Sequence, residues 1–242
     1  MLGLGNTLSG GIVPAAAPSF SNTKSIDFDG SNDYMVTDSN ISITEGTFQF
    51  WMNTTTVANH VPWYFSAGWY FYIVSSGGNI LPWILHPAGN KLYNSGSLLQ
   101  DGAWHHILWT VSGGSGEETT FIMYIDGSAV ATQTQTSTYS AVDEKLVLSR
   151  YGNGAPYYTG KMDEVAIWGS VVLDADAVAA VYNSGEPIDL SSNSGDYDNA
   201  SDLTHWWRMG DGDTFATIQD NAGSNNMTMT NMVEADIESE VP

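Results

Sequence analysis

Three carboxylates near the C-terminus have a spacing that glycoside chemistry could use. Glu234, Asp236 and Glu238 alternate in the segment VEADIESEVP. On a strand these side chains would share one face, and most glycosidases need two carboxyl groups beside the scissile bond. They stand at the extreme C-terminal end of the chain, after the fold should be complete. We therefore predict that residues 233–242 form a solvated acidic tail and not a catalytic strand.

Two adjacent histidines are candidates for metal binding. His105 and His106 are neighbours in DGAWHHILWTVS. On a strand they point to opposite faces, so we expect one packed and one exposed imidazole and no shared metal. The remaining histidines are scattered without ligand spacing, and the chain contains no Ser–His–Asp elbow or phosphate loop. The sequence therefore favours a protein that is not an enzyme.

A dense aromatic segment is a candidate for ligand binding. Its members are Trp63, Tyr64, Phe65, Trp69, Tyr70, Phe71, Tyr72 and, a little later, Trp83. Consecutive residues on a strand point to opposite faces, so some of these rings must lie outside the core. Two interpretations stay open: the outer rings pack against a partner or another segment, or they form a platform that stacks on sugar C–H faces.

Composition narrows the class of protein. The 242 residues include 27 acidic and 6 basic side chains, which gives a formal net charge of −21. Such a chain repels phosphate backbones and anionic lipids, so we expect no nucleic-acid and no membrane partner. The absence of cysteine excludes disulfides and thiolate metal sites. The first twenty residues carry no Lys or Arg and are interrupted by Gly and Pro, so we expect no secretory signal.

Period-two alternation of apolar residues predicts β-strands over most of the chain. Strands are expected near residues 26–28, 34–36, 48–52, 61–65, 69–74, 80–85, 104–111, 120–126, 145–149 and 161–168. Asp126-Gly127 predicts a tight hairpin turn. One helix is expected, with Asp174 as its N-cap and Gly185 at its C-terminal stop. Many short strands with one short helix indicate a β-sandwich or barrel.

The same patterns divide the chain into segments. Residues 1–23 form a Gly-, Ala- and Pro-rich arm that either lies against a neighbour or frays. The strand-rich body covers 24–185, a polar linker covers 186–201, and 202–232 returns to a strand-like pattern before the acidic tail.

Five motifs in a fixed order carry a family resemblance. They are SIDFDGSNDYM, TFQFWM, DGAWHHILWTVS, TFIMYIDGSAVA and GKMDEVAIWGSVVLDADAVAAVYNSG. Their order over residues 24–185 resembles the laminin-G-like domains of the concanavalin A-like superfamily. The resemblance implies an all-β antiparallel β-sandwich of the jelly-roll kind. It does not imply a ligand, because this fold serves lectins, adhesins, glycosidases and structural modules.

The segment after the linker resembles the strand that usually opens such domains. LTHWWRMGDGDTFATIQDNAGSNNMTMTN here follows the helix and does not precede the sandwich. We therefore expect either an edge strand of the same sandwich, or of a neighbour's, or the start of a truncated second module. Arg208, beside Trp206 and Trp207, is expected to stack or pair locally.

The resemblance also implies a structural Ca²⁺. Asp29 and Asp33 occupy the Asp positions of the opening turn, and Asp163 that of the G-x-x-D-E-V strand; Asn32 or Glu164 could join them. Calcium prefers such oxygen ligands, and acidic loops that meet at one edge would repel without a cation or backbone N–H groups. The alternative is that these aspartates only tie down turns.

The two ends of the chain suggest a biological setting. The combination of an MLGLGN start, one laminin-G-like body and a WWRMGDGD…MTMTNM end resembles virion proteins of tailed bacteriophages. This implies a non-enzymatic virion protein, assembled in the bacterial cytoplasm and placed on the outer surface of the particle. It would be a capsid-surface decoration or fibre subunit, present in many copies and in contact with other virion proteins. The alternatives are a carbohydrate-binding adhesin of a tail fibre or cell surface and, third, a laminarinase-type glycoside hydrolase.

Overall fold

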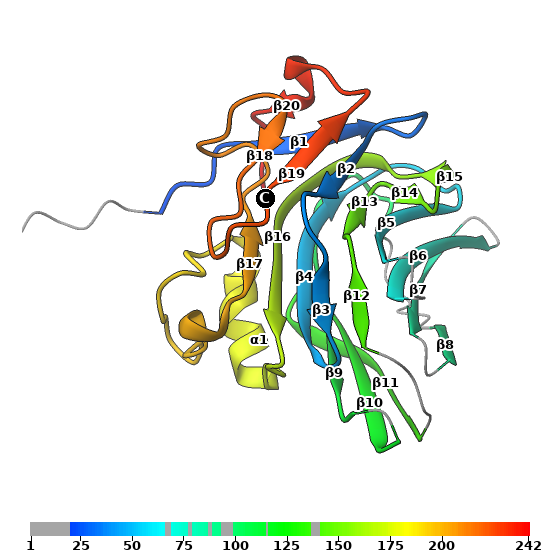
Figure 1. The fold of residues 1–242 in the computed structure, drawn as a ribbon, viewed down its shortest axis with the longest axis vertical. Coiled ribbons are helices and arrows are strands. Elements are labelled where there is room, and N and C mark those ends of the chain that lie inside the picture. Colours follow the sequence, from blue (N-terminus) through cyan, green and yellow to red (C-terminus); the bar gives the residue numbers. More distant parts are fainter. Residues whose placement is uncertain are drawn as a thin grey trace, which may run out of the picture.

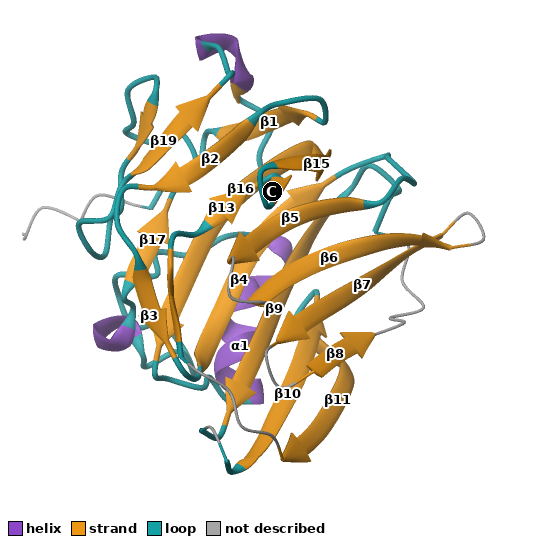
Figure 2. Ribbon diagram, turned by 45° about the vertical axis from the view of Figure 1, so that its right-hand side comes forward, coloured by secondary structure: helices purple, strands orange, loops and turns teal. Residues whose placement is uncertain are grey.

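The computed structural model describes residues 20–65, 69–76, 79–86, 89–92, 99–114, 116–136 and 141–242. These residues form two large antiparallel sheets that pack face to face, as Figures 1 and 2 show. The predicted antiparallel β-sandwich with one short helix is confirmed. Within the described ranges no helix is long and apolar enough to cross a membrane.

The first sheet has the order β11-β10-β9-β4-β16-β1-β20, and β17 pairs with part of β16. Its strands are β1 (Ser25–Asp29), β4 (Gly46–Asn53), β9 (Trp104–Ser112), β10 (Glu118–Ile125), β11 (Ser128–Thr136), β16 (Thr159–Gly169), β17 (His205–Trp207) and β20 (Ile237–Glu238). Asp126 and Gly127 join β10 to β11 with positive φ angles of 49° and 72°. These are the values a two-residue hairpin turn requires, so the predicted turn is confirmed.

The second sheet has the order β18-β19-β2-β13-β5-β6-β7-β8. Its strands are β2 (Tyr34–Thr37), β5 (His60–Phe65), β6 (Trp69–Ser76), β7 (Asn79–His86), β8 (Gly89–Leu92), β13 (Val147–Leu148), β18 (Thr217–Ile218) and β19 (Met227–Thr230). Two small ladders flank it: β3 (Ile41–Ile43) with β12 (Val142–Glu144), and β14 (Arg150–Tyr151) with β15 (Gly154–Tyr157).

The main core fills the space between the sheets because alternate residues of each strand point inward. Phe48 and Phe50 of β4 are fully buried there and contact Trp109 of β9, with ring centroids 5.3 and 6.2 Å apart. The first sheet is also covered on its outer face, where α1 (Ala175–Tyr182) packs (Figure 2). β4 is therefore almost continuously buried and forms a rigid centre for the fold.

The helix begins as predicted and ends earlier. The Asp174 carboxylate accepts a hydrogen bond of 2.9 Å from the Ala177 amide, which caps the first turn. α1 ends at Tyr182, and Asn183 takes the left-handed conformation at its C-terminus with φ 48°. Gly185 follows only after a 3-10 turn, Asn183–Gly185. Asparagine tolerates this conformation better than most residues, which explains why the helix stops before the glycine.

The segment after α1 packs on the sandwich of its own chain. In the stretch expected to be a polar linker, Leu190 and Tyr197 are buried, and the Tyr197 hydroxyl accepts a hydrogen bond of 3.2 Å from the Trp168 indole. A 3-10 turn, Ala200–Asp202, then leads into β17. β17 adds to the first sheet and β19 to the second, so residues 202–232 contribute to both layers.

The expected solvated tail is wrong in one respect, because its centre is a strand. After a 3-10 turn, Glu234–Asp236, strand β20 pairs with β1 and joins Ile237 to Ile26. The Lys161 ammonium lies 3.0 Å from the Glu238 carboxylate and 2.5 Å from that of Glu240. The open edge of β1 and the nearby cation hold the acidic segment in place. Glu234 and Asp236 lie in the turn, so they do not share a strand face with Glu238.

Candidate functional site

Strands β5 and β6 sort the aromatic segment between the two faces of the second sheet. Tyr64, Tyr70 and Tyr72 lie on the outer face and are half-buried. The residues that alternate with them are buried in the core: Trp63, Phe65, Trp69 and Phe71. The expectation that rings would lie on both faces is confirmed. The side chain of Trp83 is outside the part of the structure that is described.

A fourth tyrosine joins this cluster from the β14–β15 hairpin. The ring centroid of Tyr151 lies 5.2 Å from that of Tyr64, 5.4 Å from Tyr70 and 6.5 Å from Tyr72. Edge-to-face contacts of this kind are favourable beyond the burial of area. The hairpin and the sheet therefore hold the four rings in one arrangement.

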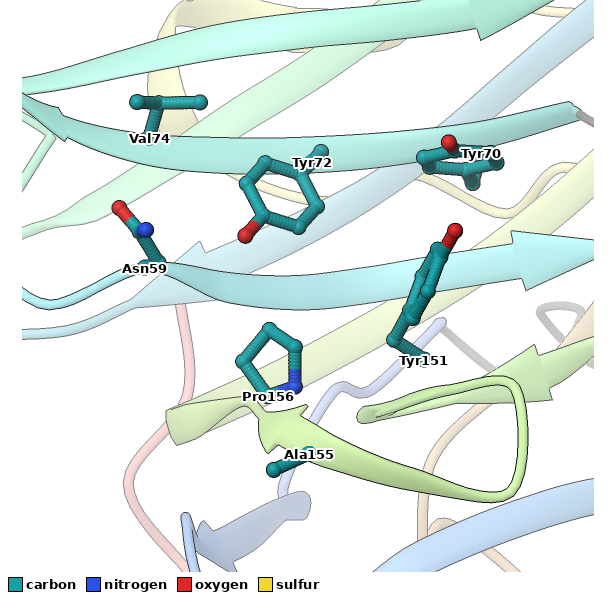
Figure 3. Close-up of a pocket in the computed structure, with 7 residues that line it drawn as sticks. All are labelled: Asn59, Tyr70, Tyr72, Val74, Tyr151, Ala155 and Pro156. Atoms are coloured by element: carbon teal, nitrogen blue, oxygen red, sulfur yellow. The ribbon is translucent and has the colours of Figure 1, made fainter.

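Three of these rings, Tyr70, Tyr72 and Tyr151, line a pocket with a volume of about 510 Å³. Its lining residues are Asn59, Tyr70, Tyr72, Val74, Tyr151, Ala155 and Pro156. In Figure 3, β6 contributes the rings of Tyr70 and Tyr72, and the hairpin contributes Tyr151 and Pro156 from the opposite side. The volume lies within the range of about 300–1,000 Å³ that small-molecule sites occupy. We therefore take this pocket as the candidate functional site.

The pocket offers neutral groups to a ligand. Burial and a side-chain hydrogen bond with Tyr151 raise the pKa of Tyr70 well above its ordinary value. Burial, chiefly, also raises the pKa of Tyr64, which contacts Tyr70 beside the pocket. Both phenols stay protonated near neutral pH, so they act as hydrogen-bond donors and acceptors. The described lining contains no carboxylate or histidine, and the chemistry it supports is recognition of an uncharged, partly apolar surface.

Sequence reasoning found the tyrosines of β5 and β6 and missed the hairpin. The signal for the hairpin was present in SRYGNGAPYY, where Gly152-Asn153, which lies between the paired residues Tyr151 and Gly154, is typical of a tight turn. What could not be read from the sequence is that this turn folds back over β6 and carries Tyr151 to Tyr70.

The aspartates expected to bind calcium lie at two separate places. The Asp29 carboxylate accepts hydrogen bonds from the backbone amides of Ser31 (2.7 Å) and Asn32 (3.2 Å), and Asp33 accepts one from the Asp29 amide (3.2 Å). These bonds tie down the opening turn, a role that the two aspartates fill without a cation. Calcium binding there stays a prediction.

Asp163 lies away from that turn. β1 and β16 pair Asp29 with Thr159 and Ile26 with Met162, so Asp163 follows at the opposite end of the ladder. Its buried carboxylate accepts hydrogen bonds from the Asn22 side chain (2.7 Å) and the Glu164 amide (2.8 Å). Across the described ranges no three His, Asp or Glu side chains are placed to hold one metal ion.

Glu164 occupies a bulge in β16 and pairs with the C-terminal segment. Its φ is 47°, and its buried carboxylate accepts a hydrogen bond from the Trp206 indole and lies 3.4 Å from the Arg208 guanidinium. Burial raises the pKa of Glu164 to about 7, although the charge of Arg208 acts in the opposite direction. Arg208 also lies over the Phe20 ring at 4.5 Å, so the expected local stacking and pairing are confirmed.

The adjacent histidines point to opposite faces as predicted, but the expected exposed imidazole is wrong, because the side chain of His105 is only 13% exposed. His106 is fully buried and its Nε2 lies 3.0 Å from the Gln49 side-chain oxygen. His105 points to the other face, where Asp126 lies 2.8 Å and Asp101 3.2 Å from its ring nitrogens. The hydrogen bond with Asp126 is the largest cause that raises the pKa of His105. Neither imidazole lines the tyrosine pocket.

Comparison with known proteins identifies the family of this chain. Residues 28–179 match the sequence profile of a laminin G family described as the concanavalin A-like lectin/glucanases superfamily. A putative carbohydrate binding protein from Bacteroides ovatus is 18% identical, with a TM-score of 0.65 over 88% of this chain and 60% of that one. The heptameric SAP-like pentraxin from Limulus polyphemus is 13% identical, with a TM-score of 0.58 over 69% of this chain and 86% of that one. No curated protein sequence matches the chain.

Proposed function

Because the chain belongs to the concanavalin A-like lectin/glucanase superfamily, we propose that it is a carbohydrate-binding protein whose ligand occupies the tyrosine pocket. The observation that carries this proposal is the set of tyrosines that line the pocket. Tyr70 and Tyr72 of the second sheet and Tyr151 of the hairpin form the aromatic wall of the pocket, and Asn59 supplies an amide at its rim.

Sugars have the two kinds of surface that this pocket complements. The C–H groups on one face of a pyranose ring pack on aromatic rings, while its hydroxyls need hydrogen-bond partners. Tyrosine supplies both an apolar ring and a polar hydroxyl, at a low entropic cost because it has few rotatable bonds. The sandwich shared with a putative carbohydrate binding protein from Bacteroides ovatus supports this reading at the level of the fold.

We propose binding without turnover. A glycosidase of the usual kind needs two carboxyl groups placed on either side of the bond. The described lining of the pocket has none. Of the alternating carboxylates in the C-terminal segment, Glu234 and Asp236 lie in a turn and Glu238 pairs with Lys161. An adhesin fits these features. The virion setting and outer-surface location stay predictions that rest on the terminal sequences and the single laminin-G-like body between them.

A glycan array tests the proposal. Wild type is compared with Tyr72→Ala and Tyr151→Ala, and with Phe215→Ala as a control. Phe215 and Tyr151 are each 39% exposed, but Phe215 lies outside the pocket, so loss of this ring tests the effect of removing any exposed aromatic. We expect wild type and Phe215→Ala to bind the same glycans. The two pocket variants should lose about tenfold in affinity, which corresponds to about 1.4 kcal/mol, because aromatic anchors carry much of the binding energy of a site.

Two results would overturn the proposal. Wild type could bind no glycan on an array that spans neutral and acidic sugars. Alternatively, Tyr72→Ala and Tyr151→Ala could bind as tightly as Phe215→Ala, with thermal melting showing that all three are folded. Sugar binding would then lie elsewhere on the molecule.

A further inference from the structure

A second hollow lies on the same face, beside the tyrosine pocket. It has a volume of about 410 Å³ and is lined by Val36, Asn40, Tyr64, Glu144, Lys145, Val147, Arg150, Gly152 and Asn153. We propose that this hollow binds an anionic group, a carboxylate or sulfate, of the same oligosaccharide whose neutral sugar occupies the tyrosine pocket. This inference rests on the proposed function and names the ligand class as an acidic oligosaccharide.

The first argument is where the positive charge lies. The chain has only 6 basic side chains against 27 acidic ones, yet Lys145 and Arg150 line the same hollow. Lys161 and Arg208 are held by carboxylates at 2.5–3.4 Å. In contrast, no salt bridge within the described part of the chain includes Lys145 or Arg150. These two cations are therefore available to an anionic ligand.

The second argument is the state of the Arg150 guanidinium. It lies 3.8 Å over the Tyr34 ring, which fixes the planar group against the sheet. Its Nε is buried and has no hydrogen-bond partner among the described residues. An arginine that is held in position and forms no salt bridge among the described residues is suited to bind a planar or tetrahedral oxyanion.

The third argument is how the two hollows are joined. Arg150 and Tyr151 are consecutive residues of β14, and each lines a different hollow. Tyr64 belongs to the charged hollow and contacts both Tyr70 and Tyr151, with ring centroids 5.5 and 5.2 Å apart. The ridge between the two hollows is thus one layer of tyrosine rings. An oligosaccharide that crosses it places neighbouring sugars in the two hollows.

Glu144 also lines the charged hollow, and its removal is expected to change affinity in the opposite direction to the removal of a cation. With Lys145 and Arg150 it leaves one net positive charge there. A carboxylate at this place can accept hydrogen bonds from sugar hydroxyls, but it repels an anionic group. Glu144→Gln is therefore expected to strengthen the binding of acidic ligands, whereas loss of either cation weakens it.

The experiment uses the full chain and three classes of probe on one array. The neutral probes are manno-, xylo- and galacto-oligosaccharides. The carboxylated probes are oligogalacturonides and alginate oligosaccharides, and the sulfated probes are heparin- and carrageenan-derived oligosaccharides. Wild type is compared with Lys145→Gln, Arg150→Gln, Glu144→Gln and the control Lys24→Gln. Lys24 has the same charge but contacts Ser239 at the C-terminal segment. The strongest acidic binder is then titrated at two salt concentrations.

We expect wild type to prefer carboxylated or sulfated probes over neutral ones. Lys145→Gln and Arg150→Gln should each lower affinity for the acidic probe by about tenfold, since charge-assisted hydrogen bonds are the stronger ones. Lys24→Gln should match wild type, and Glu144→Gln should bind the acidic probe more tightly. The carboxylated and sulfated arms identify which anion the hollow takes.

Each other outcome overturns a defined statement. If wild type binds only neutral glycans, the charged hollow is not a subsite, although the tyrosine pocket stands. If acidic probes bind but Lys145→Gln and Arg150→Gln bind as Lys24→Gln does, the anion lies elsewhere. If wild type binds no probe of any class, the proposed function itself fails.

Discussion

The rings of Tyr70 and Tyr151 meet edge to face, with centroids 5.4 Å apart and planes at 68°. Tyr70 belongs to a central strand of the second sheet and Tyr151 to the small β14–β15 hairpin. The hairpin is itself tied to the sheet, because the Ser149 amide donates a hydrogen bond of 3.0 Å to the Pro62 carbonyl. Both walls of the pocket are thus positioned before a ligand arrives, which lowers the entropic cost of binding.

Tyr70→Phe tests this preorganisation. The variant keeps the ring and removes the hydroxyl that is hydrogen-bonded to Tyr151. We expect affinity for the best glycan of the array to fall by about two- to tenfold, the effect of one neutral hydrogen bond. Titration calorimetry measures it, with the Phe215→Ala variant as the reference. Wild-type affinity in Tyr70→Phe would show that the hydroxyl contact does not position the pocket.

The strands of the core were predictable because their pattern is local. Alternation alone places Phe48 and Phe50 inward on β4, and it separates Trp63 from Tyr64 on β5. Motif order then identified the sandwich. The candidate site was only half accessible to this reasoning, since Tyr151 reaches Tyr70 through a tertiary contact that no spacing in the sequence encodes.

The C-terminal segment shows the opposite failure. Composition alone indicates a solvated tail for VEADIESEVP, because acidic residues are usually exposed. Its actual place depends on an unpaired edge of β1 and on Lys161 across the ladder. Asp163 is a similar case: the motif suggested a metal ligand beside Asp29, but the register of β1 and β16 separates the two carboxylates. Register is a property of the folded pair of strands.

Asp220→Asn is expected to loosen residues 202–232. The Asp220 carboxylate accepts hydrogen bonds from the backbone amides of Trp206 (3.0 Å) and Gly223 (2.9 Å), and lies 2.7 Å from His205 Nδ1. The side-chain NH₂ group of asparagine would face groups that now donate hydrogen bonds to the carboxylate, so these donors would lose their acceptor. We expect a loss of about 3 kcal/mol in the free energy of unfolding at pH 7, measured by urea denaturation.

The same variant has a defined pH dependence. Contacts with His205 and with backbone amides lower the pKa of Asp220 below its ordinary 3.8 despite the opposing effect of burial. The stability that this carboxylate contributes is therefore present above that pH and is lost as the pH falls below it. The difference in the free energy of unfolding between wild type and Asp220→Asn should therefore shrink at acid pH. The exposed Asp198→Asn is the control, and equal stability of the two variants at pH 7 would contradict the prediction.

His60→Phe is expected to stabilise the protein, most clearly at mildly acid pH. His60 stacks on Tyr158 with ring centroids 5.1 Å apart, and neither ring nitrogen has a partner among the described residues. Burial lowers the pKa of His60 from 6.5 to about 4. The unfolded chain therefore binds the proton more tightly, and wild type loses stability as the pH falls from 6.5 toward 4.

Phenylalanine at this position has no buried nitrogens without partners and no group that binds a proton in this pH range. We expect a gain of about 1 kcal/mol at pH 7 and a further gain of about 2 kcal/mol at pH 5 relative to wild type. Thermal and urea unfolding at the two pH values measure both. An identical loss of stability between pH 7 and pH 5 in the two proteins would show that His60 does not titrate as described.

The buried pair of Glu164 and Arg208 predicts the reverse dependence on pH. The pKa of Glu164 is about 7 in the folded protein, against an ordinary 4.5, because burial disfavours the charged form. The folded state then binds this proton more tightly than the unfolded chain does. Ionisation of Glu164 therefore costs stability progressively as the pH rises from about 4.5 to about 7.

Glu164→Gln isolates this effect. The glutamine keeps the size of the side chain and an oxygen that can accept from the Trp206 indole, but it no longer ionises. Between pH 5 and pH 8 the melting temperature of wild type should fall by more than that of Glu164→Gln, because the other acidic groups titrate in both proteins. The exposed Glu118→Gln makes the same change in net charge and should follow wild type. Parallel curves for wild type and Glu164→Gln would mean that the Arg208 guanidinium offsets the burial of the Glu164 charge, so that ionisation of this carboxyl costs the fold nothing.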